Sequence, residues 1–158
     1  MISAKLIELV HIHAARLADD VAGDLRSHQR TPAFRAVALA DLSQRVSQIF
    51  NHLGNWIGEP GSEAVKAEFA DWGGRRFGQG IPISQIVQAI IVIKAHLRRY
   101  IRDHGLVDSA FPRVEADYIL PMHLHSLQQL NEQVGAFFDE ALFQLAQGYE
   151  RAAAMPKR

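Results

Sequence analysis

Residues 72–105 constrain the fold more than any other stretch, because they join a glycine-rich helix end to a proline break and then to a strongly apolar helix. In residues 82–104, Ile83, Val87 and Ile91 spread the apolar surface over most of the helix circumference. A helix of this kind is normally central, so we expect it at the centre of the domain. One seam of this helix has alternating spacings of four and three, typical of a buried helix: Ile86, Ile90, Ile93, Leu97, Tyr100 and His104.

The residues before this stretch predict three more helices. Apolar residues with helical spacing form one stripe in residues 2–28 and another in residues 41–58, which end at a glycine. Between them, Thr31 is a candidate N-cap and Pro32 a first-turn proline, so we expect a short helical turn at residues 33–38.

Ser62 is the predicted N-cap of the third helix, whose inward positions are Val65, Phe69 and Trp72. Four glycines then follow within eight residues, each unfavourable by about 1 kcal/mol inside a helix relative to alanine. We interpret Gly73 and its neighbour as the close approach of another helix. Gly80 is predicted to be a left-handed C-cap before Pro82. The alternative, a phosphate-binding loop, requires a preceding strand, and none is predicted.

Residues 121–153 form the last predicted helix, which Pro121 should kink or restart. Its 33 residues would measure about 50 Å, so either Gly135 or Gly148 bends it or its end projects. The prediction is an all-α, five-helix bundle with a central apolar helix and a long C-terminal helix, and the alternative is a globin-like arrangement. We expect one domain at residues 1–153 and a loose tail at residues 154–158.

Charge and composition limit the function. Seventeen basic and seventeen acidic side chains argue against nucleic acid as a partner. The longest apolar run, residues 89–93, is far shorter than the roughly 18 residues of a membrane span, and the N-terminus does not resemble a signal peptide. The chain has no cysteine, which is compatible with a reducing compartment. We therefore expect a cytoplasmic protein without a membrane span.

Eight histidines raise the possibility of a metal or haem site. The pairs His11–His13 and His123–His125 point about 200° apart on a helix, so neither pair can chelate one ion. A site built from separate helices is the alternative, with His96 and His104 as the candidate cofactor contacts. We predict no metal ligands and no cofactor. There is also no nucleophile motif and no carboxylate pair on an apolar face, so we predict a non-catalytic protein.

Basic residues cluster in the central stretch and could receive an acidic partner or an anionic ligand. The alternative is a solvated helix face favoured by the helix dipole. Arg75 and Arg76 are also candidates for ordering the joint between two helices, together with Gly80 and Pro82. The other cationic residues are Lys94, Arg98, Arg99 and Arg102, of which Arg98 and Arg102 are the candidate partner contacts.

Several short segments resemble the N-terminal domain family of the bacterial RsbT co-antagonist RsbRD, which is also found ahead of histidine kinases and other signalling modules. In this chain Ile83 stands where that family usually has leucine, and Gln85 where it usually has an acid. The resemblance covers nearly the whole chain. Its segments are residues 31–34 (TPAF), 74–77 (GRRF), 80–87 (GIPISQIV) with Ala89, 137–141 (FFDEA) and 149–150 (YE).

The resemblance implies a sensory or regulatory input domain, expected to be a homodimer that feeds a signalling partner or a covalently linked output domain. We therefore expect the chain to be either a fragment of a longer signalling protein or a free-standing relative. Signalling would act through dimer contacts and displacement of the last helix. The alternatives are a small-ligand or cofactor-binding helical sensor or carrier, and an adaptor that binds an acidic partner through its basic helix face.

Overall fold

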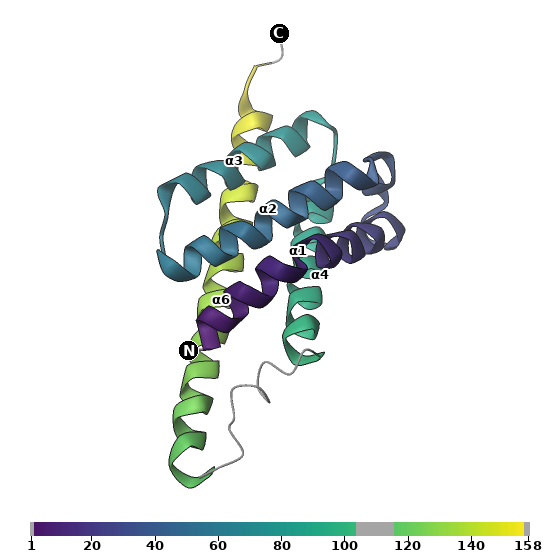
Figure 1. The fold of residues 1–158 in the computed structure, drawn as a ribbon. Helices are drawn as coiled ribbons and strands as arrows, with labels where there is room; N and C mark the ends of the chain where they lie inside the picture. The colour runs from purple at the N-terminus through teal and green to yellow at the C-terminus, as the bar shows by residue number, and fades with distance from the viewer. Residues whose placement is uncertain (1, 104–115, 157–158) are drawn as a thin grey trace.

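The computed structural model describes residues 2–103 and 116–156, and all regular structure in these ranges is helical (Figure 1). The predicted all-α fold with a long C-terminal helix is confirmed. The helices are α1 (Ile2–Ser27), the 3-10 helix η1 (Pro32–Ala36), α2 (Leu39–Gly58), α3 (Glu63–Gly78), α4 (Ile83–Asp103) and α6 (Ala116–Ala154).

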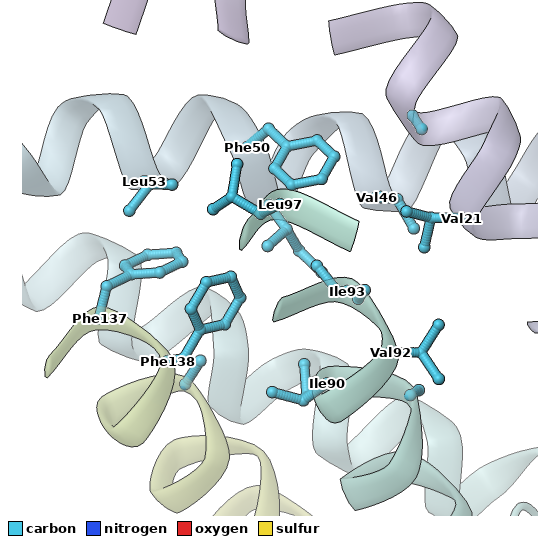
Figure 2. Close-up of a cluster of buried hydrophobic side chains, with 14 of the residues drawn as sticks. Val21, Val46, Phe50, Leu53, Ile90, Val92, Ile93, Leu97, Phe137 and Phe138 are labelled. Carbon is cyan, nitrogen blue, oxygen red and sulfur yellow. The ribbon is translucent and has the colours of Figure 1, made fainter. Parts of the chain in front are cut away.

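Two helix pairs dominate the packing: α1 lies along α2, and α3 lies against α6. Helix α4 joins the pairs by contacting both α1 and α6 (Figure 1). Figure 2 shows the resulting core, where Phe137 and Phe138 of α6 lie near Leu53 of α2 and Leu97 of α4. All four side chains are almost completely buried, and one continuous apolar cluster links them to α1.

The segment between α1 and α2 differs from its prediction in detail. Thr31 stands at the N-cap position of η1, but its side chain does not cap that helix. Instead its Oγ1 donates a 2.6 Å hydrogen bond to the Leu25 carbonyl oxygen. Thr31 is fully buried, so its hydroxyl needs a partner, and the last turn of α1 offers unpaired carbonyls. The predicted N-cap bond is therefore replaced by a bond that closes α1.

Helix α4 is less completely surrounded than its apolar pattern predicts. Its seam is buried as expected from Ile86 through Tyr100. In contrast, Ile83, Val87 and Ile91 are 37%, 36% and 48% exposed, so the apolar surface of this helix is not buried over its whole circumference. Since α4 packs mainly against α1 and α6, one of its faces is left to solvent.

Helix α6 spans 39 residues, about 58 Å. It begins at Ala116 and continues through Pro121, so the proline does not restart it. One alternative of the prediction is that an end projects: in Figure 1 the N-terminal part of α6 extends beyond the other helices, while its C-terminal part passes behind α3 and its last turn emerges beyond it. The contacts of α6 with α3 therefore lie in its C-terminal part.

The crossing of α3 and α6 has no room for side chains at two glycines. A Cβ atom on Gly73 would overlap the Leu145 carbonyl group of α6, at 2.9 Å from its carbon. A Cβ atom on Gly148 would lie 2.6 Å from the carbonyl carbon of Ala70 in α3. The prediction that Gly73 allows close approach of another helix is confirmed, and α6 is that helix.

Candidate site at the joint between helices α3 and α4

The joint is closed by backbone hydrogen bonds around Gly80. Its φ of 72° lies in the left-handed region, which confirms the predicted C-cap. The Gly80 N–H donates to the Phe77 carbonyl at 2.9 Å, and the Ile81 N–H donates to the Arg76 carbonyl at 3.1 Å. Ile81 is buried, and the Pro82 carbonyl accepts from the first turn of α4. The direction of α4 is thus fixed relative to the end of α3.

Gln85 ties this joint to η1. Its side-chain Oε1 accepts a 2.8 Å hydrogen bond from the Ala33 backbone N–H, 52 residues earlier in the chain. A carboxylate at this position would offer the same kind of acceptor, so the departure from the family's usual acid keeps this contact available. This hydrogen bond therefore links the first turn of α4 to η1.

Arg75 and Arg76 are adjacent in sequence but point to different surroundings. The Arg75 guanidinium forms a 2.8 Å salt bridge with Asp71, and both side chains are more than half exposed. The Arg76 guanidinium lies over the ring of Phe34, 5.7 Å from its centroid, and donates to Gln79 Oε1 at 2.8 Å. Of the two arginines proposed to order the joint, Arg76 contacts Phe34 and Gln79 beside it, whereas Arg75 pairs within α3.

A second arginine, which the sequence did not single out, lies beside Arg76. The Arg45 guanidinium of α2 stands over the Trp72 ring, 4.9 Å from its centroid, and donates to Gln48 at 3.2 Å. Burial, then the charge of Arg45, lower the pKa of Arg76, and Asp41 opposes this by raising it. The two cations are therefore close enough to repel each other.

Two hollows share Arg45 and Arg76 in their walls. The first, which we call the inner cavity, is an apolar space of about 50 Å³ whose walls include Phe34, Trp72 and residues of α2, α4 and α6. The second, which we call the outer pocket, is a polar space of about 190 Å³ that also includes Asp41 and Gln79. Apolar space, two cations and an opening toward solvent are thus combined at one place.

The histidine candidates are placed elsewhere. His96 Nε2 lies 2.8 Å from an Asp24 carboxylate oxygen, which links α4 to α1. His104 lies outside the described residues. Within residues 2–103 and 116–156, no group of three or more His, Cys, Asp or Glu side chains is arranged to hold a metal ion.

The basic candidates of α4 continue its exposed apolar stripe. Arg98 and Arg102 are exposed, and Lys94 is half-buried. At 100° per residue, these three share one helix face with Ile83, Val87 and Ile91, so the apolar half passes directly into a basic half. We call these six residues the α4 outer face. The structure therefore adds an apolar half to the predicted basic face.

The described residues form an all-α domain. The candidate site in these residues is a structural joint between α3 and α4 and not a set of reacting side chains. The sequence model of the RsbT co-antagonist protein rsbRD N-terminal domain matches residues 14–155. The chain belongs to this family, and the resemblance seen in its short segments is confirmed. It is thus a regulatory domain of the kind found in stressosome-type signalling.

No curated protein and no solved structure matches this chain. Among the described helices, none has the length and apolarity needed to cross a membrane.

Proposed function

We propose that this domain is a non-catalytic input module of a cytoplasmic bacterial signalling protein, of the stressosome or histidine kinase type. It acts as a homodimer and passes a change in its dimer contacts to a partner or a linked output domain through α6. Membership of the regulatory family supports the signalling role. The observation that carries the proposal is the α4 outer face, since a surface stripe of aliphatic side chains is typical of an interaction site.

The partner at this face is a second copy of the chain, with the two α4 helices antiparallel. Interfaces usually combine an apolar centre with a polar rim, as the two halves of the α4 outer face do. A parallel pair would place Arg98 and Arg102 against their own copies, and like charges repel. An antiparallel pair brings the stripes of Ile83, Val87 and Ile91 together and moves the basic halves to opposite ends.

Helix α6 is the proposed output element because α4 contacts it directly and α3 crosses it at Gly73 and Gly148. Two backbones in close contact cannot slide past one another without separating, so a shift of α3 and α4 would also shift α6. Phe77 of α3 and Tyr149 of α6 extend this contact, with ring centroids 5.2 Å apart, to the C-terminal part of α6.

Sedimentation equilibrium tests the dimer. The wild-type chain is expected to be dimeric and Val87→Asp monomeric, because the substitution places a carboxylate at the apolar centre of the interface. Ile12→Asp is the matched control, since Ile12 is an exposed aliphatic residue, 63% accessible, on a different helix, α1. The proposed interface would be refuted if the wild-type chain is a monomer at high protein concentration. It would also be refuted if both substitutions dissociate the dimer to the same extent.

A second candidate function uses the basic half of the same face to bind an acidic protein segment. The exposed Arg98 and Arg102 favour it, although Arg102 also lies 3.4 Å from Asp103. Arg98→Glu combined with Arg102→Glu should abolish binding of an acidic peptide and leave the melting temperature nearly unchanged, since exposed charges contribute little to stability. Peptide binding that survives the reversal would rule this function out.

A further inference from the structure

We propose that the joint between α3 and α4 holds a binding site for a small amphipathic anion, with its charged head at Arg45 and Arg76 and a short apolar tail in the cavity beneath them. This site can bind an anion whether or not the domain is a dimer or regulates a partner. Failure of the binding test would therefore leave the proposed function untouched, and the reverse also holds.

The positions of the two arginines support the site. They come from different helices, α2 and α3, yet both residues line the outer pocket and the inner cavity. Trp72 and Phe34 hold the two groups by contact with their ring faces. This stacking fixes planar groups in place, so their remaining N–H donors are pre-organised for a carboxylate or a phosphate.

Charge also favours an anion here. Neither Arg45 nor Arg76 has a carboxylate within salt-bridge distance among the described residues; their hydrogen bonds go to the neutral side chains of Gln48 and Gln79. Among the described residues, Asp41 is the one acidic residue in the lining of the outer pocket, so two cations face a single carboxylate. The half-buried position of Arg76 weakens solvent screening and strengthens the attraction for an anionic head.

The volumes set the size of the ligand. Because one water-sized group requires about 10–15 Å³, a cavity of about 50 Å³ accepts a tail of roughly three to five carbon atoms. The outer pocket of about 190 Å³ accommodates the head and several waters. Both are smaller than the roughly 300–1,000 Å³ of drug-sized sites. The ligand class is therefore a short-chain carboxylate or alkyl phosphate, not a long lipid.

Titration of the whole chain by ¹H–¹⁵N NMR tests the site with defined probes. Butanoate and butyl phosphate are expected to shift the Trp72 indole and the Arg45 and Arg76 side-chain signals in a saturable way. Acetate and inorganic phosphate, which lack the tail, should bind more weakly, and butylammonium should not bind. The stronger of the two butyl anions identifies the head as carboxylate or phosphate.

Substitutions separate the site from general charge effects. Arg76→Gln should weaken binding by about tenfold or more, the loss expected for one charge-assisted contact. Arg75→Gln is the matched control, since Arg75 is adjacent and equally charged but paired with Asp71 outside the pocket. Arg76→Lys keeps the charge over Phe34 and should bind with intermediate affinity, and thermal melts verify that each variant is folded.

A substitution in the inner cavity tests the binding of the ligand's apolar tail. Ala89 of α4 lines the inner cavity, and Ala89→Val fills part of it, so the preference for butanoate over acetate should shrink. Four results would overturn the proposal: no saturable shift with any anion, equal binding of butylammonium, equal weakening by Arg75→Gln and Arg76→Gln, or a chain-length preference that Ala89→Val leaves unchanged.

Discussion

Replacement of Gly148 by alanine tests the crossing of α3 and α6, on which the proposed transmission through α6 depends. The new Cβ would lie 2.6 Å from the Ala70 carbonyl carbon and 2.8 Å from its Cα. These are backbone atoms of a packed helix, so they cannot turn aside as a flexible side chain would. The two helices would have to separate, and the aromatic contacts between Phe69 and Phe137, whose centroids are 5.6 Å apart, would loosen.

The magnitude follows from two opposing effects. Alanine is favoured over glycine inside a helix by about 1 kcal/mol. Overpacking of a tight contact costs about 1–3 kcal/mol, and contact with backbone belongs at the upper end. Gly148→Ala should therefore lower the free energy of unfolding by about 1–2 kcal/mol. Gly135→Ala is the control in the same helix: among the described residues, no atom outside the adjacent backbone of α6 lies within 4 Å of its Cβ position, so it should stabilise by up to about 1 kcal/mol.

Urea unfolding followed by circular dichroism measures both variants, supported by thermal melts. A difference of about 2–3 kcal/mol between them corresponds to melting temperatures roughly 5–10 °C apart for a chain of this size. Equal stability of the two alanine variants would refute the close crossing of α3 and α6 at this register.

Three further predictions concern the joint and the core. Gly80→Ala should lower the free energy of unfolding by about 1–2 kcal/mol, because φ is 72° there; denaturant unfolding measures it, and no loss would contradict the left-handed cap. Gln85→Leu should cost about 1–3 kcal/mol by removing the acceptor of the Ala33 N–H, whereas Gln85→Glu, measured alongside, should retain most of the stability. Burial raises the pKa of Tyr100 above its ordinary 10.0, so the unfolded chain loses this proton first as pH rises. Stability should therefore fall above about pH 10, and less steeply in Tyr100→Phe; equal alkaline slopes would contradict the burial argument.

Features fixed by local backbone chemistry were predictable from the sequence. Ser62 caps α3 by accepting from the Val65 N–H at 3.5 Å, and Gly80 takes the left-handed conformation expected before Pro82. These outcomes depend on residues close together in the chain. The close approach at Gly73 was also predictable, because four glycines near one helix end need a structural reason, but its partner Gly148 required the fold.

Features that depend on how many neighbours a helix has were not predictable. The apolar pattern of α4 could not show that Ile83, Val87 and Ile91 stay exposed, because periodicity records hydrophobicity and not contacts. Arg45 gave only a weak signal, a charge at the edge of the inward stripe of α2. Its position beside Arg76 arises from the packing of two helices, which no local pattern encodes.

The most direct test of the proposed transmission is hydrogen exchange along α6 when the dimer face of α4 is altered. Amide exchange measured by mass spectrometry in the wild-type chain and in Val87→Asp should differ in two places. The first is the α4 stripe itself, and the second is the part of α6 that packs on α3, because α4 and α3 both contact α6. Ile12→Asp should match the wild type in both. A change confined to α4, with α6 unaffected, would contradict the account.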